Sequence, residues 1–176
     1  MKTSDPLYSP HVLELITVAN EYCLFLEKVE PIEVEDLIEY LRKILPLLYI
    51  KGSLLPEFNP DEPQPERYVT EQEWETVFND LRTKFGELDE FYFIDHSDPG
   101  DAEPWKGSLA DHLADIYQDL KDFLLLFQKN TYTAQQNAIC DCRELFRIHW
   151  GERLTRAHYV IHQLRFRDQA KTEQDF

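Results

Sequence analysis

"SLADHLADIYQDLKDFLLLF", residues 108–127, decides the fold because its apolar side chains recur every three or four residues. This spacing gathers them on one face of a helix, as in the helices of a bundle. Ser108 begins a capping box, so we expect the helix to span about residues 108–129. Its apolar stripe consists of Leu109, Leu113, Ile116, Leu120, Phe123 and Phe127.

The same stretch carries aspartates between its apolar positions. Helical spacing places Asp111, Asp115 and Asp122 away from the stripe. Because charged side chains are costly to bury, we expect these three carboxylates on the solvent-facing side of the helix.

Two helices are expected before this stretch. Ser9 followed by Pro10 is a helix start, with a hydroxyl cap and then a residue that needs no N–H donor. Apolar residues then repeat at helical spacing over residues 10–29 and again over residues 32–51. Pro46 is expected to kink or end the second helix. The short connection between the two helices predicts an antiparallel pair.

Two further helices have similar signals. A capping box at Thr70 opens a helix predicted over residues 71–85. The last helix is predicted over residues 134–165, with a cap at Thr133. Gly151 lies in the middle of it and costs roughly 1 kcal/mol relative to alanine. We therefore expect a close packing neighbour or a bend at this glycine.

The connections differ in composition from the helices. Residues 56–66 are rich in proline and predict an extended surface loop. Residues 86–107 hold aromatic, acidic and turn residues without helical periodicity, so we expect an irregular strap with one short extended piece at Phe91–Ile94. The predicted fold is all-α: residues 1–176 form a single-domain helical bundle of about five helices with a long acidic irregular connection.

The charge distribution restricts the partners. The chain has 176 residues and a net charge of −16. Residues 57–103 hold 15 acidic and 3 basic side chains, whereas residues 143–176 hold 5 acidic and 7 basic ones. An acidic protein repels phosphate backbones, so nucleic acid is not expected as a partner. A basic protein partner or self-association remains compatible with this charge, as does a role in solubility alone.

The chain also carries signals about its compartment. The first residues, MKTSDPLYSPH, lack the apolar region of a signal peptide, and the longest apolar runs are too short to span a bilayer. An odd number of cysteines, three, without such a signal predicts reduced thiols in the cytoplasm. Cys140 and Cys142 point to different sides of the predicted helix and are not expected to share a metal.

Four segments together resemble a known family. They are "VANEYCLFLE" (18–27), "LPLLYIKGSLLP" (45–56), "WKGSLADHLADIYQDLKDF" (105–123) and "WGERLTRAHYVIHQL" (150–164). They resemble an uncharacterised family of Bacteroides-type bacteria, domain of unknown function 5063, over nearly the whole chain. The resemblance implies an α-helical, cytoplasmic, single-domain protein. It implies no reaction and supplies no catalytic residues.

Three candidate anion or ligand residues lie on the last predicted helix. Arg143 and Arg153 flank the centre of its apolar stripe, and His149 lies at the edge. An arginine inside a bundle must be paired, because an unpaired buried charge is not tolerated. In the main interpretation, each arginine either forms a structural ion pair or packs its aliphatic stem while its guanidinium reaches water. The alternative is that the arginines bind an anion. Expected acidic partners are Glu14, Glu21, Glu35, Glu39 or an acid of the strap.

Candidate metal ligands are the histidines and one glutamate. His158 and His162 are four residues apart and share one helix face, the spacing of a two-histidine zinc clamp, but the HExxH glutamate is missing. His149 and Glu152 are three apart, and His112 could approach them together with Asp115 or Asp119 from the preceding helix. Di-iron bundles need Glu-x-x-His on two helices, and here the order is reversed and occurs once.

The sequence therefore leaves several functions open. No nucleophile elbow, phosphate-binding loop or dinucleotide-binding glycine pattern occurs, and no cofactor is predicted. The leading hypothesis is a non-enzymatic cytoplasmic interaction or assembly module. The alternatives are a helical-bundle metal-binding protein or enzyme with a His/Glu/Arg site, and a bundle that binds a small ligand between its helices and the strap.

Overall fold

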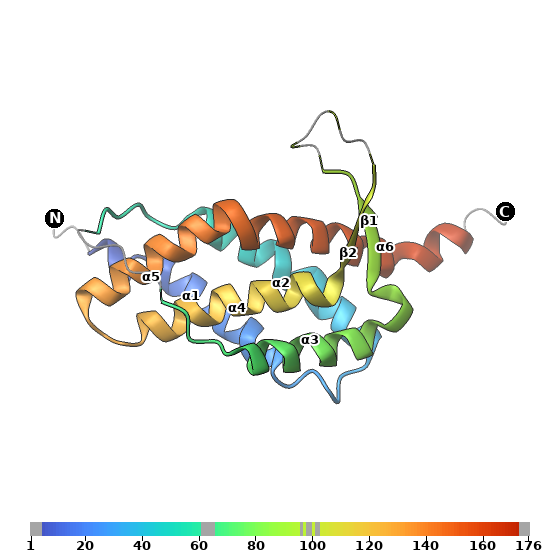
Figure 1. Cartoon of the computed structure of the whole chain (residues 1–176), viewed down its shortest axis with the longest axis horizontal. Helices are drawn as coiled ribbons and strands as arrows, with labels where there is room; N and C mark the ends of the chain where they lie inside the picture. The colour runs from blue at the N-terminus through green and yellow to red at the C-terminus, as the bar shows by residue number, and fades with distance from the viewer. Residues whose placement is uncertain (1–4, 61–65, 96, 98–99, 101–102, 173–176) are drawn as a thin grey trace.

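The computed structural model describes residues 5–60, 66–95, 97, 100 and 103–172. Parts of the predicted proline-rich loop (61–65) and of the predicted strap (96, 98–99 and 101–102) lie outside these described residues. The fold is an elongated all-α bundle, as predicted, with a small two-stranded sheet at its side (Figure 1). Its helices are α1 (Pro10–Leu26), α2 (Val34–Ser53), α3 (Glu71–Phe85), α4 (Leu109–Phe127), α5 (Tyr132–Leu145) and α6 (Gly151–Thr172).

The predicted helices are all present: most begin and end within three residues of the predicted bounds, and the last continues seven residues further than predicted, to Thr172. α3 has the predicted bounds, and both bonds of its capping box at Thr70 form. α1 ends three residues earlier than predicted, at Leu26. α2 continues through Pro46 to Ser53, so this proline does not end the helix. The reason is packing: the buried residues of α2 continue on both sides of Pro46, from Leu45 to Leu48.

α4 is the central helix of the bundle. It packs against α1, α3, α5 and α6, while α2 packs against α1 and α6 (Figure 1). The predicted stripe faces the core, where Leu109, Leu113 and Leu120 are fully buried. Polar groups in the core are paired: the hydroxyl of buried Tyr22 donates to the carbonyl oxygen of Leu113 over 2.9 Å. Within the described residues, no helix has the length and apolar character needed to cross a membrane.

Two segments of the predicted irregular strap form β-strands. Strand β1 (Glu90–Phe93) pairs antiparallel with strand β2 (Trp105–Ser108), with Phe91 opposite Gly107. The expected extended piece is therefore one half of a hairpin. A Cβ at Gly107 would come within 2.7 Å of the Phe91 ring, so the glycine makes room for this buried aromatic side chain. The hairpin links the end of α3 to the start of α4.

The last predicted helix is interrupted by one π-helical turn, Phe146–Trp150, between α5 and α6. The helical stretch begins at Tyr132, and its N-terminal cap is Thr131 rather than the predicted Thr133. A side chain at Gly151 would collide with the carbonyl oxygen of Phe146, which explains the glycine. Trp150 is fully buried and donates from its indole nitrogen to the carbonyl oxygen of Cys142 over 3.0 Å. Such π turns occur often at functional sites.

Candidate functional site

Four aspartates of α4 form a row on one side of the helix: Asp111, Asp115, Asp119 and Asp122, hereafter the aspartate row. Their spacing of four, four and three residues keeps them on one face. The prediction that Asp115 and Asp122 face solvent is wrong, because α3, the π turn, α6 and residues 66–69 cover them. Asp119 and Asp122 are only 5% and 1% exposed. The row is therefore an internal polar face of the bundle.

His149 lies against the middle of this row. Its Nδ1 is 2.6 Å from Oδ2 of Asp119, and its Nε2 is 3.6 Å from Oδ2 of Asp115. The hydrogen bond to Asp119 raises the pKa of His149 above its ordinary value, against the opposing effect of burial. The π turn supplies His149, so the local helix geometry places this imidazole between α6 and α4.

Arg153 completes the network. Its Nε lies 3.0 Å from Oδ2 of Asp115 and 3.1 Å from Nε2 of His149, and its Nη1 lies 3.2 Å from Oδ2 of Asp111. The expectation of a carboxylate partner for Arg153 is correct. The expected partners on the first two helices and the strap are wrong, because the acids come from α4. The expectation failed because it assigned these aspartates to solvent.

Asp115 is held in a half-buried position by groups from two helices. The indole nitrogen of Trp74 on α3 donates to its Oδ1 over 2.9 Å, while Arg153 binds its Oδ2. Burial nevertheless raises the pKa of Asp115, and the neighbouring charge of Arg153 only partly offsets this effect. Removing the arginine would therefore leave a poorly solvated carboxylate.

Asp122, at the far end of the row, is a structural anchor. Its Oδ1 accepts hydrogen bonds from the backbone N–H groups of Tyr68 and Val69, at 2.7 and 2.9 Å. Arg67 approaches Oδ2 at 3.9 Å. Burial raises the pKa of Asp122. These contacts fasten the chain just before α3 onto α4.

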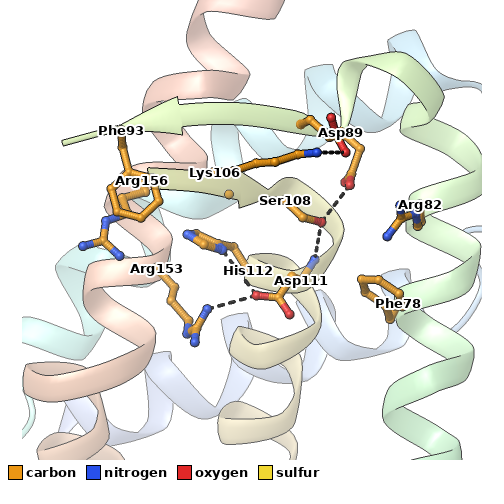
Figure 2. A pocket seen from close by; sticks show the side chains of 12 residues that line it. Phe78, Arg82, Asp89, Phe93, Lys106, Ser108, Asp111, His112, Arg153 and Arg156 are labelled. Atoms are coloured by element: carbon orange, nitrogen blue, oxygen red, sulfur yellow. Dashed lines mark hydrogen bonds and ion pairs between the residues drawn. The ribbon is translucent and has the colours of Figure 1, made fainter. Parts of the chain in front are cut away.

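A cleft opens beside the other end of the row, where α3, the hairpin, the start of α4 and α6 meet (Figure 2). Its volume is about 570 Å³, within the usual range for small-molecule sites. Asp111 and Arg153 belong to both the network and the cleft. The lining also includes Phe78, Arg82, Phe93, Lys106, His112 and Arg156.

His112 is the unusual residue of the cleft. It is only 4% exposed, yet neither ring nitrogen has a hydrogen-bond partner among the residues that the structure describes. Nδ1 lies 3.7 Å from Oδ2 of Asp111, beyond hydrogen-bonding distance. The proximity of His112, followed by that of Arg153, lowers the pKa of Asp111. The edge-on ring of Phe91 packs against the imidazole, with ring centroids 5.3 Å apart.

Cations approach the cleft from both walls. On one wall Arg156 stacks over Phe93 at 4.1 Å from the ring centroid and pairs with Glu152. On the opposite wall Arg82 of α3 lies over Phe78, 5.8 Å from the ring centroid, and makes no ion pair with any described residue. Lys106 of the hairpin pairs with Glu90 at 2.6 Å. Figure 2 shows Arg153 and Arg156 of α6 on one side of the cleft and Arg82 of α3 on the other.

The N-terminus of α4 is not available to a ligand. Asp89, only 2% exposed, accepts hydrogen bonds from the backbone N–H of Ala110 and the hydroxyl of Ser108, both at 2.7 Å. Its carbonyl oxygen accepts the N–H of Leu109 at 2.9 Å. Asp89 thus already supplies the negative charge that a helix N-terminus attracts. A ligand in the cleft must bind through side chains.

Other predicted site residues lie elsewhere. Arg143 is exposed and pairs with Glu57 at 2.5 Å, away from the cleft. His158 and His162 line a separate, mostly apolar groove between α2 and α6, beside Tyr49. Burial, together with the nearby His162, lowers the pKa of His158.

The predicted metal ligands do not converge. Glu152 is occupied by Arg156, and His112 and His149 approach different aspartates of the row. Within the part of the chain that the structure describes, no group of three His, Cys, Asp or Glu side chains is arranged to hold a metal ion. The structure brings His149 and Arg153 together, and it places His112 in the cleft beside them.

Sequence reasoning missed Asp111, Asp89 and Arg82, and it considered Asp115 and Asp119 only as possible companions of His112 in a metal site, not as partners of Arg153 and His149. The spacing of the aspartates was a usable signal. A helix surrounded by other helices has no free polar face, so a regular row of acids opposite the apolar stripe predicts basic partners on a neighbouring helix.

Comparisons with known proteins agree with the resemblance seen in the sequence. The family model "Domain of unknown function (DUF5063)" matches residues 6–167. The crystal structure of protein BF1032 from Bacteroides fragilis superposes with a TM-score of 0.80 and is 32% identical, covering 91% of this chain and 95% of that one. No curated protein matches the chain. With a family match over nearly all of its length, the chain belongs to the family of domain of unknown function 5063.

Proposed function

We propose that the protein binds a small anionic molecule in the cleft between α3, the hairpin, α4 and α6. The observation that carries this proposal is His112, a buried imidazole without a hydrogen-bond partner among the described residues. An unsatisfied buried polar group costs about 1–3 kcal/mol, and such groups call for an explanation. Both ring nitrogens are covered by neighbouring side chains, so a ligand that bonds to His112 must displace some of these side chains, and it would then remove this cost.

The charge of the cleft supports an anion. The chain as a whole carries a net charge of −16, whereas the cleft lining has four cations, Arg82, Lys106, Arg153 and Arg156, against three carboxylates, Asp89, Glu90 and Asp111. Three of these four cations already have acidic partners, while Arg82 has none among the described residues. A carboxylate or an oxyanion can bind between the facing arginines with charge-assisted hydrogen bonds. The aromatic rings of Phe78 and Phe93 would then contact the rest of the molecule.

A ligand screen tests the proposal. We expect sulfate, phosphate or small carboxylates to raise the melting temperature, because a ligand at about one hundred times its Kd stabilises the folded state by roughly 2.7 kcal/mol. His112→Phe should fold with similar stability but lose this response, since it removes both ring nitrogens. Arg82→Gln should weaken the response, and Arg143→Gln, outside the cleft, is the matched control. An undiminished response of His112→Phe would contradict the proposal.

A second candidate is an interaction module, the leading hypothesis from the sequence. It is favoured by exposed apolar side chains around the groove between α2 and α6, where Tyr49, Ile50 and Tyr159 are 41%, 52% and 65% exposed. Clustered exposed apolar residues mark protein contacts. Light scattering tests self-association: a dimer that Ile50→Glu converts to a monomer would support it, and a concentration-independent monomer would oppose it. The acidic charge disfavours nucleic acid, as stated above, and suits a basic protein partner.

We also propose a bacterial cytoplasmic location. All three cysteines are free thiols, and Cys23 and Cys142 are buried in the core. Burial raises the pKa of both thiols, which makes them poor nucleophiles. Fractionation of cells that produce the protein at its native level tests this location.

A further inference from the structure

Arg153 links the cleft to the buried network, and this position gives the cleft a means of control. Its Nη1 binds Asp111, which lines the cleft, at 3.2 Å. Its Nε lies between Asp115 at 3.0 Å and His149 at 3.1 Å. Any change in the contacts of the guanidinium with Asp115 and His149 therefore changes the hydrogen bonds that it can donate to a ligand in the cleft.

The hydrogen bonds of His149 show in which of its protonation states Arg153 is held most firmly. When His149 is neutral, its Nδ1–H donates to Asp119 at 2.6 Å, and its Nε2 lone pair accepts from Arg153. When His149 is protonated, Nε2 carries a hydrogen and cannot accept. The nearest acceptor for that hydrogen is Oδ2 of Asp115, at 3.6 Å, the same oxygen that Arg153 binds.

We propose that protonation of His149 loosens Arg153 from the network and strengthens anion binding in the cleft. The inference deepens the proposed function and rests on it. In the protonated state Arg153 loses one acceptor and shares Asp115 with a second cation. The guanidinium is then less neutralised by protein carboxylates and available to an anion, and the region carries one more positive charge. By linkage, a bound anion must in turn promote protonation of His149.

The groups around His149 support this behaviour. From α4, Asp115 and Asp119 face it, and from α6, Arg153 does. From α3 the neighbour is Trp74, which binds Asp115 and does not titrate. From α5 the titratable neighbour of Asp119 is Cys142, and burial raises its pKa so far that it stays neutral. Among the groups that contact Arg153 directly, His149 is thus the one whose charge changes near neutral pH, and its pKa lies above the ordinary value.

Sulfate is a suitable probe because its charge is constant near neutral pH. We expect the Kd of the wild-type protein for sulfate, measured by calorimetry, to fall roughly tenfold between pH 9 and pH 6, within the usual range of coupling between sites. His149→Gln should bind sulfate with a Kd that changes less than about twofold over this range. His11→Gln, an exposed residue of α1, is the control and should keep the wild-type slope.

Two outcomes separate this inference from the proposed function. If His149→Gln keeps the full pH slope, the inference is wrong while the binding site stands. If the wild-type protein and Arg143→Gln bind no anion at either pH, the proposed function fails.

A measurement without ligand tests the coupling on its own. In NMR titrations, Arg153→Gln should raise the pKa of His149 further, because it removes a neighbouring positive charge. Arg143→Gln should leave that pKa in place. An identical His149 titration in wild-type protein and Arg153→Gln would overturn the inference whatever the cleft binds.

Discussion

Nδ1 of His149 lies 2.6 Å from Oδ2 of Asp119, a residue that is 5% exposed. This contact joins the π turn to the central helix of the bundle inside the protein. A charge-assisted hydrogen bond of this kind is stronger than one between neutral groups. The stability of the fold and the protonation of one imidazole are therefore connected.

The first prediction concerns stability and pH. Because the folded protein raises the pKa of His149 above about 6.5, the contribution of the protonated imidazole to the free energy of unfolding is fully present below that pH. It is lost as the pH rises through the folded pKa. We expect Asp119→Asn to destabilise the protein by about 1–3 kcal/mol at pH 6 and by less at pH 9, in urea unfolding. An equal loss at both pH values would contradict the assignment.

The second prediction concerns Asp122 and the chain before α3. Asp122→Ala removes the acceptor of two backbone N–H groups, those of Tyr68 and Val69, and should cost about 2 kcal/mol. Asp122→Asn keeps an acceptor and should cost less, because burial already disfavours the charged form. Hydrogen exchange at the amides of Tyr68 and Val69 should accelerate in the alanine variant. Equal protection in the two variants would rule out this anchoring role.

The third prediction concerns the contact between α2 and the π turn. A Cβ at Gly52 would collide with the indole ring of Trp150 and come within 2.9 Å of the Phe146 ring. Gly52→Ala should therefore lower the free energy of unfolding by about 1–3 kcal/mol, despite the better helix propensity of alanine. Its neighbour Ser53→Ala is the control, expected within about 0.5 kcal/mol.

A double-mutant cycle sharpens that test. In a Trp150→Phe background the side chain opposite residue 52 is smaller, so Gly52→Ala should cost less than in the wild-type protein. The same cost in both backgrounds would show that the close contact between Gly52 and Trp150 is not the cause.

The fourth prediction concerns the start of α4. Asp89→Ala removes the carboxylate that accepts from Ala110 and Ser108, and should destabilise the protein by about 1–2 kcal/mol. The amide of Ala110 should exchange faster with solvent. Glu87→Ala, an exposed acid just before the hairpin, is the matched control. Unchanged exchange at Ala110 would show that another group caps the helix.

The sequence predicts the helices because apolar spacing and capping residues are local signals. Thr70 and the stripe beginning at Leu109 fix α3 and α4 closely. Pro46 shows the limit of such signals, since its local preference is outweighed by burial of its neighbours in α2. The pairing of β1 with β2 depends on residues more than ten positions apart, and local patterns do not contain it.

The site is only partly predictable for the same reason. His149 and Arg153 are identifiable because charged and polar groups beside an apolar stripe are unusual. Their partners on α4 are not, because the face of Asp115 looks solvent-exposed until the positions of α3 and α6 are known. His112 was named as a metal candidate, but its burial without a partner among the described residues is a tertiary property.

The π turn at Phe146–Trp150 also constrains how the chain can vary in length. Such a turn contains one residue more than regular helical winding and keeps α6 in phase with α5, so the loss of one residue there can be absorbed by conversion to an ordinary α-helical turn. The loss of one residue from the regular winding between the turn and Arg153 would instead rotate everything after it by about 100° about the helix axis. Arg153 would then swing away from Asp111, and the apolar face of α6 would leave the core. In homologous chains, a one-residue deletion within this long helical stretch should therefore fall in the π turn, and other changes in length should fall in the loops.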